Sequence, residues 1–187
     1  DSPGTLSGRV SGRVPVPGVP SYSWRKIHLK VSLVPGTGPH TFIGSVSEYP
    51  FMRVTFLGTN GWYDTETGNT ICTLVEAGPW RILLDAGNGL RRLGSPIGDR
   101  DHPVHLFLSH FHIDHVAGLH ILARFSFPGG LSIWGQPGTG EILSRFLAPP
   151  FTAPLHDLPY PVRIRDLPEG THHLPFTVTC KYLPHAS

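Results

Sequence analysis

The sequence predicts an α/β fold in which β-sheets are covered by helices. Short apolar runs that alternate like β-strands recur from residue 53 onward, and amphipathic stretches with helical spacing stand between the later runs. Strands and helices that alternate in this way bury the faces of a sheet against a helical layer. With 187 residues, of which 39% are hydrophobic, the chain is long enough to enclose one such core.

The strands are predicted where β-branched and other apolar residues cluster between turn-forming residues. These runs lie at 53–58, 70–76, 81–85, 104–108, 131–134, 162–166 and 176–183. The run at 104–108 reads VHLFL and is apolar at four of its five positions, which predicts a buried strand.

Helices are predicted where apolar residues recur three or four positions apart. One covers 116–125, with Leu119, Leu122 and Ala123 on one face, and a second covers 139–147. A turn or short helix is expected at 88–93. The stretch 148–161 is expected to be a loop because it holds five prolines, which cannot continue a helix or a sheet ladder.

The segment 1–51 differs in composition from the rest of the chain. It is rich in Gly, Pro, Ser and Val, shows no helical period and precedes the only methionine, Met52. We therefore expect the natural domain to span 52–187, with 1–51 as a leader, a linker or a disordered non-native extension. The stretch 26–34 alternates like a strand, which leaves additional sheet structure open.

Composition and charge argue against several classes of protein. No apolar run approaches the roughly 20 residues that a membrane-spanning helix needs. Cys72 and Cys180 stand far apart and outside any metal-binding pair, so we expect reduced, buried thiols in the cytoplasm. The net charge is +2, but 52–187 holds ten Lys and Arg against eleven Asp and Glu. Charge alone therefore does not favour nucleic-acid binding.

A cluster of histidines directly after the apolar strand at 104–108 is the strongest functional signal. Residues 110–115 read His-Phe-His-Ile-Asp-His, which places three imidazoles and a carboxylate within six positions. Imidazole and carboxylate are the ligands that suit Zn²⁺ and similar ions. His110 and His112, two positions apart in extended geometry, point the same way and can reach one ion. A histidine-rich loop without a metal is the alternative, but a cluster that ends a buried strand and opens a helix favours a metal site.

This cluster, within the segment 109–119, resembles the H-x-H-x-D-H signature of the metallo-β-lactamase superfamily. Four other segments are similar to that family in the same order along the chain. They are FLGT at 56–59, the D-x-G segment LDAGNG at 84–89, the Gly/Pro turn IWGQPGT at 133–139 and YLPH at 182–185. The Gly/Pro turn is typical of the ribonuclease Z branch. The resemblance implies the N-terminal portion of an αββα sandwich.

The resemblance also implies a dinuclear metal site, with two Zn²⁺ ions in the complete site and Mn²⁺ or Fe²⁺ as alternatives. His110, His112 and His185 would hold one metal, while Asp114 and His115 would begin the second site. Asp114 would also act in catalysis as a proton acceptor. His172 and His173 compete with His185 for the role of third ligand.

Other residues have predicted supporting roles. Asp85 would support the metal site by hydrogen bonding a ligand, and the alternative is a turn or helix-capping aspartate. Asn60, Gly61 and Trp62 lie in the turn after the first strand, which borders the active site in the family. They would either contact substrate or serve only the geometry of the turn.

The implied function is metal-dependent hydrolysis of a phosphodiester by a zinc-activated hydroxide, as in ribonuclease Z-like enzymes that process tRNA. The substrate is RNA or a small cyclic or nucleotide diester. Thioester or lactam hydrolysis, or metal binding without turnover, are the alternatives. The family's bridging aspartate and last histidine would follow His185, and the sequence ends at Ser187. We therefore expect a domain truncated at its C-terminus that is weakly active alone, with no membrane partner and with a homodimer left open.

Overall fold

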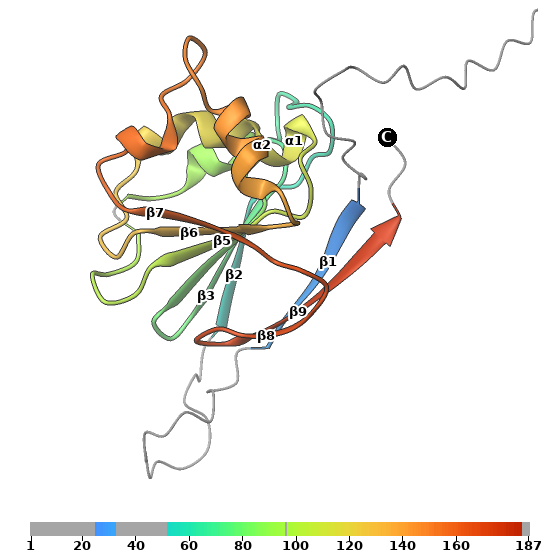
Figure 1. Ribbon diagram of the computed structural model, residues 1–187. Coiled ribbons are helices and arrows are strands. Elements are labelled where there is room, and N and C mark those ends of the chain that lie inside the picture. The colour runs from blue at the N-terminus through green and yellow to red at the C-terminus, as the bar shows by residue number, and fades with distance from the viewer. Residues whose placement is uncertain (1–24, 33–51, 96, 185–187) are drawn as a thin grey trace, which may run out of the picture.

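The computed structural model describes residues 25–32, 52–95 and 97–184, whose strands form two β-sheets (Figure 1). The larger sheet has the strand order β2-β3-β4-β5-β6-β7, and the smaller sheet has the order β1-β9-β8. The strands of the larger sheet are β2 (Met52–Gly58), β3 (Cys72–Ala77), β4 (Trp80–Leu84), β5 (Val104–Phe107), β6 (Leu131–Gly135) and β7 (Val162–Asp166). Those of the smaller sheet are β1 (Arg25–Ser32), β8 (Gly170–His173) and β9 (Thr177–Pro184).

The larger sheet changes direction halfway across. Strands β2, β3 and β4 pair antiparallel, whereas β4, β5, β6 and β7 pair parallel. The carboxyl ends of parallel neighbours meet at the same edge of a sheet, which is where open α/β sheets bind ligands. The ends of β4 and β5 therefore bring together Asp85 and the histidine cluster, two segments that lie far apart in the sequence.

Short helices follow the strands. They are η1 (Asn88–Arg92), α1 (Ile113–Val116), η2 (Ala117–Arg124), α2 (Thr139–Phe146) and η3 (Leu155–Asp157), where η marks 3₁₀ geometry. The helix predicted at 116–125 is thus a tighter 3₁₀ segment after one α-turn. One contact accounts for the break: the Gly118 N–H donates to the Ala86 carbonyl at 2.8 Å instead of to its own helix. No helix in the described part of the chain is long and apolar enough to cross a membrane.

Three layers result, with helices on one face of the larger sheet and the smaller sheet on the other (Figure 1). Leu106 of β5 belongs to the core under the helices, and its neighbour Phe107 belongs to the core between the sheets. Both faces of β5 are therefore buried, as its apolar sequence predicted. These layers are the helix, sheet and sheet layers of the expected αββα architecture, and the α/β prediction is confirmed.

Strand β1 lies inside the segment 1–51, for which composition had predicted a leader or extension. Its residues pair antiparallel along the whole length of β9, from Arg25 opposite Pro184 to Ser32 opposite Thr177. The alternating apolar pattern at 26–34 had allowed for an additional strand, and β1 is that strand. The pairing satisfies the backbone donors and acceptors on one side of β9, while β8 pairs with the first half of the other side, from Thr177 to Cys180. The domain boundary at Met52 stays a prediction.

Two glycines allow the turn after β2 to pack against η1. A Cβ atom on Gly89 would lie 2.7 Å from the Gly58 Cα and 2.7 Å from the Thr70 carbonyl oxygen. Both neighbours are backbone, so neither can move aside as a flexible side chain would. The segments FLGT and LDAGNG, separate in the sequence, are therefore in direct contact beside the histidine cluster.

Candidate metal centre

The histidine cluster lies where β5 ends and α1 begins. The backbone of His112 is extended (φ −63°, ψ 148°) and precedes the first turn of α1, which carries Asp114 and His115. The ring centroid of His110 lies 4.5 Å from that of His112 and 4.0 Å from that of His115. The Nε2 atom of His115 lies 3.5 Å from an Asp114 carboxylate oxygen. Four of the five predicted metal ligands are thus brought together.

Asp85 contacts this cluster from the end of β4. Its Oδ2 atom lies 2.9 Å from the Nδ1 atom of His115. The Ser109 N–H donates to Oδ1 at 2.7 Å, and the Ser109 hydroxyl donates to Oδ2 at 2.9 Å. A carboxylate on one ring nitrogen of a histidine fixes the ring and leaves the other nitrogen to face a metal. Asp85 therefore contacts a predicted ligand, His115, directly. It does not cap the following helix η1, whose N-terminus has no side-chain cap.

The backbone of Asp85 is in the left-handed region, with φ at +57°. This conformation is uncommon for a residue other than glycine, and such outliers collect at functional sites. Its N–H donates to the Phe107 carbonyl at 2.9 Å, which ties the end of β4 to the end of β5. The residue with this strained backbone is therefore the one whose carboxylate contacts Ser109 and His115.

The Asp114 carboxylate is nearly buried and receives a hydrogen bond from the backbone of a distant loop. The Trp62 N–H donates to Asp114 Oδ2 at 2.8 Å. Burial alone would raise the pKa of this carboxyl, but the Trp62 hydrogen bond and the neighbouring His115 outweigh it and hold the pKa below its usual value. Asp114 is therefore anionic at neutral pH, the form in which a carboxylate binds a metal.

The loop that reaches Asp114 contains the predicted substrate turn. Asn60 forms a β-bridge with Thr70, and its side-chain amide donates to the Thr65 hydroxyl at 3.0 Å. Gly61 is exposed, with no atom within 4 Å of where a Cβ would lie. Of this turn, Trp62 bonds the cluster through its backbone N–H, and a substrate contact by Asn60, Gly61 or Trp62 stays a prediction.

Ser109 is a second residue whose contribution sequence reasoning did not assign. Its hydroxyl contacts Asp85 and lies 3.0 Å from the Nδ1 atom of His110 and 3.3 Å from that of His115. In the sequence, the feature that could have identified Ser109 was its position directly before the first histidine of the motif. The Trp62 contact had no comparable signal, because it is made by a backbone N–H that any residue could supply.

The remaining histidines are placed as follows. His185 lies outside the described residues. Its rivals His172 and His173 belong to β8 of the smaller sheet, and the His172 ring bonds the Pro168 carbonyl at 2.7 Å. Within residues 25–32, 52–95 and 97–184, no set of three or more His, Cys, Asp or Glu side chains is arranged to hold a metal ion. In chemistry, however, the donor set fits a borderline divalent ion: clustered imidazoles, an anionic carboxylate and a further carboxylate behind one imidazole.

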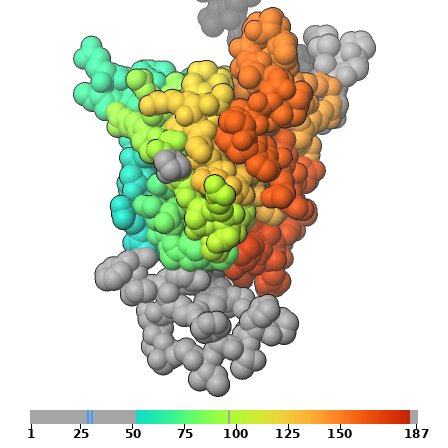
Figure 2. All heavy atoms as spheres, turned by 90° about the vertical axis from the view of Figure 1, so that its left-hand side faces the viewer, coloured from blue at the N-terminus to red at the C-terminus, as the bar shows by residue number. Residues whose placement is uncertain are grey.

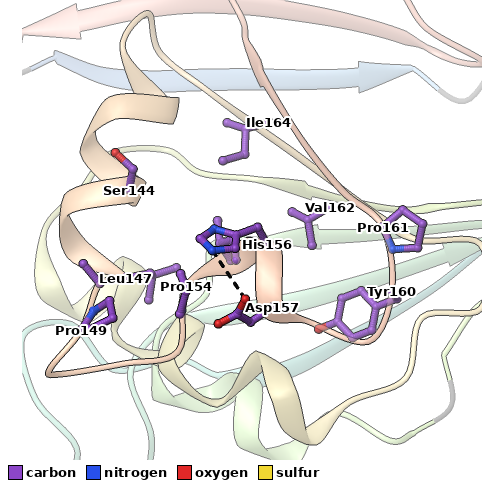
Figure 3. A pocket seen from close by; sticks show the side chains of 12 residues that line it. Ser144, Leu147, Pro149, Pro154, His156, Asp157, Tyr160, Pro161, Val162 and Ile164 are labelled. Carbon is purple, nitrogen blue, oxygen red and sulfur yellow. Dashed lines mark ion pairs between the residues drawn. The ribbon is translucent and has the colours of Figure 1, made fainter.

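A cavity of about 830 Å³ lies elsewhere, between α2, the loop 148–161 and β7 (Figure 3). Its walls are largely apolar, with Leu147, Tyr160 and Ile164 among them. The polar pair His156 and Asp157, 3.5 Å apart, also faces this space (Figure 3). None of the predicted metal ligands lines this cavity, so its size alone does not make it the reaction site.

Known proteins similar to this chain agree with the motif. Residues 80–187 match the β-lactamase superfamily domain. Ribonuclease Z of Bradyrhizobium diazoefficiens is 38% identical over 125 residues, which cover 63% of this chain and 40% of that protein. Ribonuclease Z of Staphylococcus carnosus is 30% identical over 148 residues, which cover 72% of this chain and 46% of that protein. The chain thus spans less than half the length of these relatives.

Solved structures of similar fold include the metallo-β-lactamase fold protein YhfI from Bacillus subtilis. It is 23% identical, with a TM-score of 0.48, over 68% of this chain and 51% of that chain. The short form of human tRNase Z is 22% identical, with a TM-score of 0.46, over 62% of this chain and 44% of that chain. The family itself is shown by the domain match: since 80–187 is more than half of the sequence, the chain belongs to the β-lactamase superfamily.

Proposed function

We propose that this chain carries part of the active site of a zinc-dependent phosphodiesterase of the ribonuclease Z type, which cleaves RNA in the cytoplasm. The observation that carries the proposal is the convergence of His110, His112, Asp114 and His115 at the carboxyl ends of parallel strands, with Asp85 behind them. The relatives called ribonuclease Z support the choice of reaction and substrate.

His110, His112 and His185 would hold one zinc ion, and Asp114 with His115 would begin the site of a second. A bound zinc ion supplies a Lewis acid that brings the pKa of water to about 7, so that hydroxide is available at neutral pH. The protein's own contribution is to orient the ligands. Asp85 and Ser109 fix the ring of His115, and Trp62 holds the carboxylate of Asp114.

Formation of the hydroxide nucleophile takes a proton from water, and Asp114 would accept that proton. Attack also places additional negative charge on the phosphoryl oxygens, which metal ions held by the histidine cluster would stabilise. The new P–O bond forms as the bond to the leaving ribose oxygen breaks. The products are a 3′-hydroxyl or 5′-hydroxyl end and a phosphate end, according to which ester bond is cleaved.

Substrate preference tests this proposal. The full protein, with zinc supplied, is assayed on bis(p-nitrophenyl) phosphate, on a thioester and on a β-lactam. We expect hydrolysis of the phosphodiester alone. Hydrolysis of the thioester or the lactam without the diester would contradict the proposal and identify another activity of the superfamily. A tRNA precursor with a 3′ extension, compared with a cyclic nucleotide, then distinguishes an RNA substrate from a small diester.

A further inference from the structure

A cavity of about 350 Å³ is lined by basic side chains on the helical side of the molecule. Its walls are formed by Asp64, Asn88, Arg91, His120, Ile121 and Arg124. These residues come from the loop after β2, from η1 and from η2. In the space-filling view the blue-green loop projects at the upper left, next to the light green of η1 and the yellow of η2 (Figure 2).

The segments that line this basic cavity also border the histidine cluster. The loop that carries Asp64 donates the Trp62 N–H to Asp114. The helix η2, which carries His120 and Arg124, continues directly from α1 and therefore from His115. A Cβ on Gly87, at the start of η1, would clash with the Asp114 carbonyl oxygen. The basic cavity is thus built on the same backbone as the predicted metal ligands.

Two arginines, Arg91 and Arg124, line this cavity. Among the described residues no carboxylate lies within the 4 Å of an ion pair from Arg91 or Arg124, although other arginines form such pairs. Arg124 donates one hydrogen bond, to the Arg91 carbonyl at 3.1 Å, which holds its guanidinium over η1. A guanidinium has five N–H donors, and among the described residues one of those on Arg124 has a hydrogen-bond acceptor. Its Cζ atom also lies 5.9 Å from the centroid of the Phe125 ring.

The one carboxylate in the cavity wall already has its hydrogen bonds within the loop. Asp64 Oδ1 accepts from the Thr70 N–H at 2.6 Å, and Oδ2 accepts from the Asn88 amide at 3.0 Å. These bonds orient Asp64 toward its own loop and η1 rather than toward the arginines. Among the described residues, Arg91 and Arg124 therefore have no anionic partner within ion-pairing distance.

We propose that this basic cavity binds a backbone phosphate of the RNA substrate, next to the phosphate that is cleaved. The inference rests on the proposed function, because an RNA substrate is what supplies a second phosphate beside the first. Arginine is the side chain best suited to phosphate, since its planar donors match the phosphate oxygens. Contacts of this kind position a nucleic acid and carry no sequence information. Arg91 and Arg124 would hold the strand in register with the metal site.

Binding of RNA, measured apart from cleavage, tests the basic cavity. The full protein is titrated with a fluorescent tRNA-like hairpin in EDTA, over a range of salt concentrations. We expect Arg91→Ala and Arg124→Ala each to weaken binding by about tenfold, as for loss of a charge-assisted hydrogen bond. Each should also reduce the slope of log K against log salt by about 1. Arg91→Lys, which keeps the charge but loses the fork of donors, should bind with intermediate affinity.

Arg92→Ala is the matched control, because it removes the same charge from the same helix at a residue that does not line the cavity. We expect Arg92→Ala to bind RNA nearly as well as the parent protein. Equal losses in Arg91→Ala and Arg92→Ala would show a diffuse charge effect and overturn the cavity assignment, as would unchanged binding in all variants. If RNA binding depends on Arg91 and Arg124 but the parent protein cleaves no phosphodiester, the proposed function fails and the anion site stands.

Discussion

At the scale of single residues, the predicted metal ligands are oriented by hydrogen bonds from neighbouring side chains. Asp85 touches Ser109 and His115, and through Ser109 it is connected to His110. The motif alone predicts which residues bind a metal, because spacing fixes which side chains can face one ion. It predicts poorly which residues support them, because those come from other strands. Asp85 was predicted only through the family resemblance, and the contacts of Ser109 and Trp62 with the cluster were not predicted.

Removing the charge of Asp85 tests its supporting role. Asp85→Asn keeps the size of the side chain but weakens the bond to His115, and we expect zinc affinity to fall by about 10-fold to 100-fold. The measurement is competition with a chelating dye. Asp99→Asn is the control, since Asp99 bonds His102 on the surface. Equal zinc affinity in Asp85→Asn and the parent would show that Asp85 serves only the turn.

His105 provides a residue-scale prediction for pH. It is buried among Trp80, Trp134 and Phe176, and it accepts a hydrogen bond from the Trp134 indole N–H at 3.2 Å. Burial lowers the pKa of this histidine from 6.5 to about 4. The unfolded chain therefore takes up a proton near pH 6.5, which the folded protein resists until about pH 4.

Stability contributed by neutral His105 is complete above pH 6.5 and is lost as the pH falls from 6.5 toward 4. The loss should amount to about 3 kcal/mol of unfolding free energy. Urea unfolding at several pH values measures it. We expect His105→Leu to flatten this part of the pH profile and His156→Ala, at an exposed site, to leave it unchanged. An equally steep profile in His105→Leu would contradict the prediction.

At the scale of elements, strands with strong apolar patterns were predicted well and short or polar ones were not. Strands β2 to β7 and β9 lie within a few residues of their predicted positions. Strand β8 reads GTHH, which has no apolar alternation, and it forms because β9 offers a paired edge. The predicted helix at 116–125 winds as η2 because Gly118 bonds Ala86 across the site. Tertiary contacts, which local sequence does not contain, decide both cases.

The contact of Gly58 with Gly89 gives a prediction at this scale. Gly89→Ala would place a methyl group 2.7 Å from backbone atoms of Gly58 and Thr70, and we expect a loss of about 1–3 kcal/mol in unfolding free energy. Chemical denaturation measures the loss. Gly140→Ala is the matched control, because nothing lies within 4 Å of its added methyl and alanine favours the helix α2. Similar stability of the two variants would show that the close approach is not required.

At the scale of the whole molecule, the larger sheet organises both cores and the site. Helices cover one of its faces and the smaller sheet covers part of the other, so the parallel strand ends form a fixed edge for the ligands. On edge strand β2, Met52 and Phe56 are 63% and 67% exposed, and Val54 between them is exposed as well. Their neighbour Val75 on β3 packs into the core between the sheets, so the described smaller sheet does not extend over β2.

The proposed function depends on metal binding by the histidine cluster, and zinc titration of the full protein measures this binding most directly. We predict that the parent protein binds zinc and that His112→Ala lowers its zinc content or weakens its affinity at least about tenfold, since a ligand is lost. His156→Ala, which removes an exposed histidine bonded to Asp157, should bind zinc as the parent does. Zinc content and affinity unchanged in His112→Ala would contradict the account, because the motif would then not be the metal site.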